Sequence, residues 1–236
     1  MKGNEEKKRQ DLHQTAEEIN KYKYRRRVFA ILAVACAILL GTLYAISAVY
    51  MVTGSFTVSI NKHEMVMYGL SLSEHADLTH ATSMLNMRID QSITNIAEED
   101  IPDNVDQIDG EHCGKNYIAY TFYLFNSGET DELNYEWQVK MSNVFNGIDE
   151  AIRLKLYING EPTTYAKTAS NGSGAEPNTT PFYSTDVMAR GRVDHFVSGS
   201  VTKYTMVLWL EGTDPDCVDW IKGGSMKVEM QMSVIH

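Results

Sequence analysis

The sequence predicts an all-β protein, a two-sheet antiparallel sandwich of the jelly-roll type, preceded by a single N-terminal transmembrane helix. Two observations carry this prediction. Residues 28–52 (VFAILAVACAILLGTLYAISAVYMV) contain no charge, amide or histidine. After them come many short segments in which apolar and polar residues alternate, a pattern typical of strands with one buried and one solvated face.

The apolar stretch is long enough to span a bilayer. As a helix it would measure about 37 Å, against about 30 Å for a hydrocarbon core. A basic cluster comes directly before it, at Lys21, Lys23, Arg25, Arg26 and Arg27. The positive-inside rule therefore predicts a cytoplasmic tail at residues 1–27, a signal-anchor helix at 28–52 and an extracellular domain at 53–236.

A removable signal peptide is the alternative to a retained anchor. Ala45 and Ser47 place small residues where a signal peptidase cleaves, so cleavage near Ser47 would release the domain. The apolar stretch exceeds the usual signal-peptide core of about 7–15 residues, which favours the anchor and a cell-membrane location.

Charge is distributed unevenly between the predicted parts. The net charge of −10 divides into +4 for residues 1–27 and −14 for residues 28–236. Affinity for nucleic acid comes largely from basic side chains that neutralise phosphates. We therefore expect the membrane, reached through residues 28–52, as a partner and exclude nucleic acid.

Strands are expected throughout the exported part. Residues 117–125 and 204–210 are apolar or aromatic on both faces, which predicts central strands or strands covered by something else. Asn159-Gly160 predicts a type I′ hairpin turn. Further strands are predicted at 55–60, 64–72, 84–90, 135–141, 152–158, 181–188 and 226–234.

Three stretches break this alternation. Residues 170–181 (SNGSGAEPNTTP) predict an exposed loop, and residues 97–116 are an acidic excursion. Residues 214–224 (DPDCVDWIKGG) predict a short helix with Asp214 as N-cap and Gly223 beyond its end.

No catalytic motif is present in the sequence. His63-Glu64 resembles the opening of H-E-x-x-H, but residue 67 is Met and the stretch reads as a strand. There is no G-x-S-x-G nucleophile motif either. We therefore expect a non-enzymatic protein without a catalytic cofactor.

Acidic side chains offer weak candidates for Ca²⁺ ligands. One group has its members three residues apart and consists of Asp100, Asp103, Asp106 and Asp109. A second group lies near the C-terminus and consists of Asp214, Asp216 and Asp219. The spacing does not match an EF-hand loop. The sequence allows two interpretations of these residues: charged side chains of solvated loops, or ligands of a calcium site.

Three cysteines are present, and two of them lie in the exported part. Cys36 falls in the apolar stretch and is expected to be a small apolar residue. Cys113 and Cys217 could form a disulfide, since such bonds persist outside the cell. Sequence alone also allows two separate thiols.

Three segments are distinctive when taken together: GSFTVSINK after the apolar stretch, NYIAYTFYLFNSGE in the middle and KYTMVLWLEGTDPDCVDWIKGGSMKVEMQMSV near the end. Their order and wording resemble the TasA/camelysin family of Gram-positive surface and biofilm-matrix proteins. The resemblance implies an exported jelly-roll domain and fibres in which one subunit's N-terminal strand completes its neighbour's sheet. Camelysin carries a metalloprotease label, but no zinc-ligand motif stands in this sequence. The uninterrupted apolar span favours a tethered relative.

The expected function is that of a membrane-anchored surface structural or interaction protein that self-associates or binds other surface proteins. Strand addition by residues 54–60 (GSFTVSI) is the expected mechanism. The alternatives are a camelysin-type surface metalloprotease and a module that binds calcium or cell-wall polymer.

Overall fold

The computed structural model describes residues 20–44, 54–89, 92–129 and 132–235. The chain divides into two compact units, residues 1–50 and 51–236. Each unit is described by itself.

The first unit contains one long helix, Asn20–Tyr44, with a mean hydropathy of 2.1 over its most apolar window. By length and composition this helix could cross a membrane. Within the described residues the helix includes the basic cluster before Val28 as well as the apolar residues 28–44. Residues 45–52 of the predicted span, including the predicted cleavage point near Ser47, lie outside the described residues.

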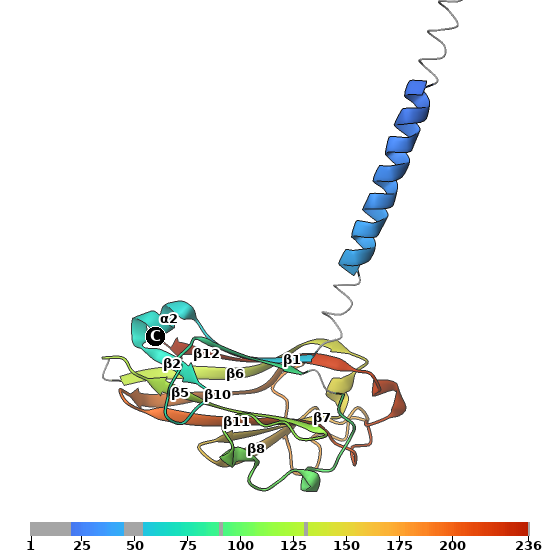
Figure 1. The fold of residues 1–236 in the computed structure, drawn as a ribbon. Helices are drawn as coiled ribbons and strands as arrows, with labels where there is room; N and C mark the ends of the chain where they lie inside the picture. Colours follow the sequence, from blue (N-terminus) through green and yellow to red (C-terminus); the bar gives the residue numbers. More distant parts are fainter. Residues whose placement is uncertain (1–19, 45–53, 90–91, 130–131, 236) are drawn as a thin grey trace, which may run out of the picture. The chain divides into compact units, whose positions relative to one another are not determined.

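The second unit is mostly β and contains two sheets that pack face to face (Figure 1). The first sheet has five strands in the order β10-β6-β12-β1-β3. In that order their bounds are Val187–Val197, Glu132–Phe145, Ser225–Ile235, Gly54–Ile60 and Met84–Ile89.

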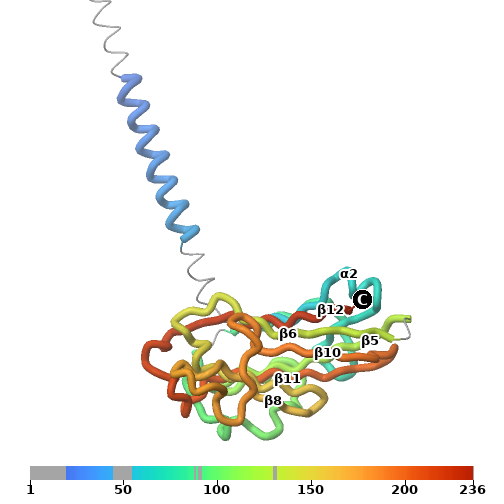
Figure 2. Tube along the Cα trace, turned by 180° about the vertical axis from the view of Figure 1, so that it is seen from behind, coloured from blue at the N-terminus to red at the C-terminus, as the bar shows by residue number. Residues whose placement is uncertain are grey.

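The second sheet has seven strands, in the order β2-β5-β11-β7-β8-β9 with β4 beside β5. In that order their bounds are Leu70–Ser73, Tyr117–Asn126, Val201–Leu210, Ile152–Ile158, Glu161–Ala166, Thr180–Pro181 and Gly110–Glu111. Seen from behind, β6 and β12 lie in one layer while β8 and β11 lie in the other (Figure 2).

The helical elements of this unit are short. Helix α2 spans Lys62–Tyr68. The 3₁₀ turns η1 to η4 span Glu98–Asp100, Val105–Gln107, Ile148–Glu150 and Asp219–Ile221.

The main core lies between the two sheets and takes residues from both. Phe56 of β1 packs edge-on against Tyr120 of β5, with ring centroids 5.4 Å apart. The hydroxyls of Tyr135 on β6 and Tyr204 on β11 lie 2.8 Å apart inside this core. Because both hydroxyls are buried, this hydrogen bond spares each of them the cost of an unpaired polar group.

The pairing is mixed rather than purely antiparallel, which corrects the predicted sandwich. Strand β1 runs parallel to β12 and antiparallel to β3, and β9 runs parallel to β8. The alternation of apolar residues indicates which face of a strand is buried but says nothing about the direction of its neighbours. The structure does not confirm jelly-roll connectivity.

Strand β7 and the hairpin after it agree with the sequence. Strand β7 has the predicted bounds, and Asn159 and Gly160 join it to β8 with φ of 52° and 89°, as a type I′ turn requires. Strands β5 and β11 are central in their sheet. Their outer face is also covered, because Ile101 and Val105 of the acidic excursion pack there with Val207 and Trp209.

Residues 64–72 were predicted as one strand, but most of them form α2. The Asn61 side chain accepts a hydrogen bond from the backbone N–H of His63, and Gly69 ends the helix with φ of 71°. Val66 and Met67 point into solvent. The cap and the left-handed glycine therefore outweigh the apolar pattern of this stretch.

Two other predictions near the C-terminal half also need correction. The strand expected at 181–188 is divided between β9 and β10, and β10 continues to Val197 through polar residues that hide its alternation. In residues 214–224, Asp214 lies in a turn and Val218 is the N-cap of η4.

Candidate functional site

A cluster of buried charges lies on the outer face of the second sheet. Its centre is Arg153 of β7, which is 4% exposed and lies opposite Trp209 of β11 and Ala166 of β8. Its neighbours Ile152 and Leu154 belong to the main core. Because side chains alternate along a strand, Arg153 must point to the other face.

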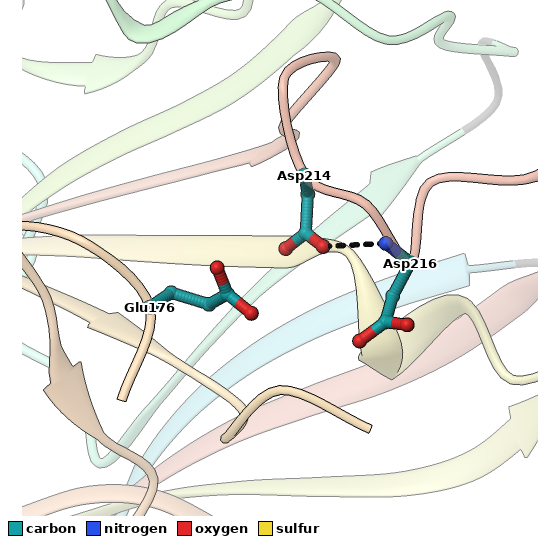
Figure 3. Close-up of side chains that lie close together, drawn as sticks. All are labelled: Glu176, Asp214 and Asp216. Atoms are coloured by element: carbon teal, nitrogen blue, oxygen red, sulfur yellow. Dashed lines mark hydrogen bonds between the residues drawn. The ribbon is translucent and has the colours of Figure 1, made fainter. Parts of the chain in front are cut away.

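The turn that follows β11 supplies Asp214. This side chain is fully buried, and its Oδ2 lies 2.5 Å from Nη2 of Arg153. Its Oδ1 accepts a hydrogen bond of 2.8 Å from the backbone N–H of Asp216, as Figure 3 shows. The turn therefore directs Asp214 inward and brings Asp216 beside it.

The loop between β8 and β9 supplies Glu176, which is 7% exposed. Its Oε2 lies 3.9 Å from Nη2 of Arg153. The same loop is joined to the turn after β11, because the backbone N–H of Ser170 donates to Oδ2 of Asp216 at 2.9 Å and the Ser170 hydroxyl donates to Oδ1. Two segments far apart in the sequence thus close over Arg153.

These contacts bring three carboxylates together. One oxygen from each of Glu176, Asp214 and Asp216 lies within 4.8 Å of the other two (Figure 3). Within the part of the chain that the structure describes, this is the one group of three or more carboxylate, imidazole or thiol ligands that gather in this way.

A fourth carboxylate, Glu211, is buried nearby but is saturated by hydrogen bonds. Its Oε2 accepts from Nε1 of Trp209 at 2.9 Å, and its Oε1 accepts from the backbone N–H and the hydroxyl of Thr213 at 3.1 and 2.7 Å. Burial opposes ionisation, but these donors outweigh it and lower the pKa of Glu211. Glu211 is therefore a structural anion.

Glu176 and Asp216 respond differently to the same surroundings. Burial, with the negative charge of Asp214 adding to it, raises the pKa of Glu176. Hydrogen bonds from Ser170 lower the pKa of Asp216. Of these two side chains, Glu176 is therefore the one whose charged form is less well compensated.

Only two of the seven aspartates proposed from the sequence, Asp214 and Asp216, belong to this cluster. Asp219 is exposed and pairs with Lys222 at 2.6 Å. The four aspartates of the acidic excursion do not gather. Asp100 accepts from the backbone N–H of Ala97, Asp109 accepts from the Tyr123 hydroxyl, Asp103 is exposed and Asp106 is half-buried.

Sequence reasoning missed Arg153 and Glu176. The alternation of residues 152–158 placed Arg153 on a solvated face, and Glu176 is a single carboxylate in a loop rich in Gly, Ser and Asn. Neither position carries a sequence signal of burial, because the covering loops are joined to the sheet by contacts between distant segments.

Cys113 and Cys217 are free thiols in the structure, so the bridge considered from the sequence is not formed in it. The Cys113 thiol lies 3.8 Å from Sδ of Met87, and both cysteines pack against the main core. Burial raises the pKa of both thiols. In this arrangement both side chains contact the core as small, half-buried residues.

Strand β1 is the second feature with functional meaning. It lies between β12 and β3, with Phe56 opposite both Val228 and Met87. Phe56, Val58 and Ile60 are buried in the main core. The outer face is polar, and Ser59 donates to Oε1 of Glu229 at 3.2 Å.

No family model matches the chain, and no curated protein matches it. A solved β-glucosidase from Kluyveromyces marxianus, in complex with glucose, is similar over 68% of this chain and 15% of its own, with 10% identity and a TM-score of 0.23. AvmM, which catalyses macrocyclization in alchivemycin A biosynthesis, is similar over 51% of this chain and 80% of its own, with 9% identity and a TM-score of 0.23. This chain thus spans only a small part of the β-glucosidase. At these TM-scores neither likeness supports a conclusion about fold or function.

Proposed function

We propose that this chain is a non-enzymatic, membrane-anchored structural or interaction protein of the cell surface, with residues 1–27 in the cytoplasm and residues 53–236 outside. The observation that carries the proposal is the position of β1. Strand β1, the first strand in the described part of the chain, lies inside a sheet, between β12 and β3. The membrane helix is therefore joined to the domain through a central strand, which suits a protein that must stay attached at a surface. The resemblance to TasA/camelysin proteins supports the same assignment.

The proposed mode of assembly is exchange of β1 between chains. Strand β1 supplies backbone pairing on both sides and three alternating side chains that fill the core, Phe56, Val58 and Ile60. Backbone pairing of this kind gives affinity, and the buried alternate side chains give specificity. A neighbouring chain's β1 is identical and would fill the same position with the same contacts.

Engineered cysteines test this mechanism. Thr57 and Glu229 are register partners on the outer face of the parallel β1–β12 pair. We expect a chain carrying Thr57→Cys and a chain carrying Glu229→Cys, both with the native cysteines replaced by Ser, to form a disulfide between chains when they assemble. One chain carrying both substitutions and oxidised before assembly should stay monomeric, because its β1 is locked in its own sheet.

The matched control is Ser55→Cys with Gln231→Cys. These positions lie on the same two strands and the same face, but Ser55 pairs with Lys227 and not with Gln231. This pair should not crosslink. Assembly of the locked chain, or the absence of crosslinks between chains in assembled material, would contradict strand exchange.

Surface attachment is tested separately. We expect the mature protein on intact cells to retain the residues before Ser47 and to fractionate with membranes. A mature N-terminus close to Ser47 would show a released protein and would contradict the anchor, while leaving strand exchange open.

A further inference from the structure

We propose that Glu176, Asp214 and Asp216 bind a divalent cation, with Ca²⁺ the best match, and that this ion fastens two loops to the outer face of the second sheet. This site goes beyond the proposed surface role and does not depend on it.

The ligand chemistry favours a hard cation. The three groups offer carboxylate oxygens only, and one oxygen from each lies within 4.8 Å of the other two. Ca²⁺ binds oxygen ligands at about 2.3–2.6 Å, so ligands around one ion lie up to about 5 Å apart. Zinc and copper prefer nitrogen and sulfur ligands. The oxygen-only ligand set therefore favours a hard cation, and the spacing is compatible with a single Ca²⁺.

The carboxylates around Arg153 outnumber the positive charges there. Arg153 is the buried cation, and it faces the buried carboxylates of Glu176, Glu211 and Asp214 with Asp216 beside them. The nearby Lys167 is already shared between Asp149 and Glu150, at 2.5 and 2.7 Å. Burying unpaired charge is strongly unfavourable. A divalent cation would remove most of this excess.

An independent observation points to a missing ligand. Asp214 is fully buried, and its Oδ2, aimed toward Glu176 in Figure 3, accepts no hydrogen bond. Its contact with Arg153 is short, yet it lies outside hydrogen-bond geometry, and Nη1 of Arg153 has no acceptor either. The guanidinium is thus near the carboxylates without pairing with them in the bidentate manner typical of Arg. Oδ2 therefore retains lone pairs for a cation.

The carboxylates of Glu211 and Asp219 lie near the cluster but already have partners. Glu211 has three donors on its two oxygens, and Asp219 is exposed beside Lys222.

Glu176, by contrast, accepts no hydrogen bond on its side chain from the described residues and has only the 3.9 Å contact with Arg153. The half-buried Asp216 gives an ion access from solvent.

A bound ion would join three segments that the hydrogen bonds already bring close. Glu176 belongs to the loop between β8 and β9, Asp214 and Asp216 belong to the turn after β11, and Arg153 lies on β7 beneath them. Calcium modules of comparable ligand number bind with dissociation constants of about 0.1–1 mM. The loops would therefore be fastened wherever free Ca²⁺ reaches the millimolar range.

The test uses the full-length chain in detergent at 0.15 M NaCl, with calorimetric titration of CaCl₂ and thermal unfolding. We expect one site per chain and a rise in Tm of about 5 °C at 10 mM Ca²⁺. Glu176→Gln should weaken binding at least tenfold, and so should Asp214→Asn. The controls Asp219→Asn and Asp103→Asn remove equal charge from exposed positions and should bind as the native chain does.

Asp214→Asn changes a contact of Arg153 and could affect folding, so Glu176→Gln is the deciding variant. Its folding is verified by a native-like unfolding transition without calcium. The proposal is overturned if 10 mM Ca²⁺ produces neither binding heat nor a Tm shift. It is also overturned if Glu176→Gln binds as tightly as the two controls.

Discussion

Strand β7 buries both of its faces, but by different means. Ile152, Leu154 and Leu156 enter the apolar core between the sheets. Between them, Arg153 and Lys155 point to the outer face, where covering segments reach them with carboxylates. Burial of an apolar side chain stabilises the fold directly, whereas burial of a charge only offsets its own desolvation when its partners are well placed.

The outer face itself is covered unevenly. Arg153 is almost fully enclosed by the turn after β11 and the loop between β8 and β9. Two residues further along, Lys155 keeps a side-chain exposure of 22% and pairs with Glu98, which is 40% exposed. The same strand and the same face thus hold one buried and one solvated ion pair. Substitutions at 153, 154 and 155 compare the three environments directly.

The largest effect is expected for Arg153→Met. Removing the guanidinium leaves Asp214 and Glu176 buried without a positive partner, which should lower the free energy of unfolding by about 4 kcal/mol. Urea denaturation without divalent cations measures this change. Methionine retains the length of the side chain, so lost packing contributes little.

A second substitution verifies the cause. Asp214→Asn combined with Arg153→Met removes one of the two carboxylate charges that Arg153→Met leaves without a positive partner. The double variant should therefore regain part of the lost free energy of unfolding. If the double variant is as unstable as the sum of the two single variants, the ion pair is not the source of the effect.

A smaller loss is expected for Leu154→Ala on the inner face. Leu154 is fully buried among side chains of both sheets, and truncation to alanine should lower the free energy of unfolding by about 3 kcal/mol through lost burial and a cavity. This loss should not change with calcium, because Leu154 points away from the carboxylates. The same urea series with and without 10 mM Ca²⁺ checks both statements.

The inner face could be predicted from the sequence, and the outer face could not. Ile152, Leu154 and Leu156 alternate with polar residues, which fixes both the strand and its core side. The same alternation predicts solvent around Arg153, and the structure buries it. The loop between β8 and β9 is joined to the turn after β11 by side-chain contacts such as the two hydrogen bonds from Ser170 to Asp216, which leave no periodic signal.

The candidate site was predicted only in part for the same reason. Asp214 and Asp216 stand two residues apart in one turn, so a local pattern could identify them. Glu176 joins them from a different loop. The parallel pairing of β1 with β12 also escaped prediction, because it joins the two ends of the domain. The sequence therefore predicts candidate ligands that are close together along the chain, but it does not predict contacts between distant segments.

The smallest effect is expected for Lys155→Met. Nζ of Lys155 lies 2.8 Å from Oε1 of Glu98, but both side chains are partly exposed. Water and salt therefore compensate much of the lost attraction, and pairs of this kind typically contribute about 0.2–1 kcal/mol. A double-mutant cycle with Glu98→Gln, measured by urea denaturation at 0.05 and 0.5 M NaCl, isolates the pair. We expect a coupling below about 1 kcal/mol that shrinks with salt. A coupling as large as the loss at Arg153 would mean that η1 shields this pair as well as the loops shield Arg153, and the contrast between the two positions would then disappear.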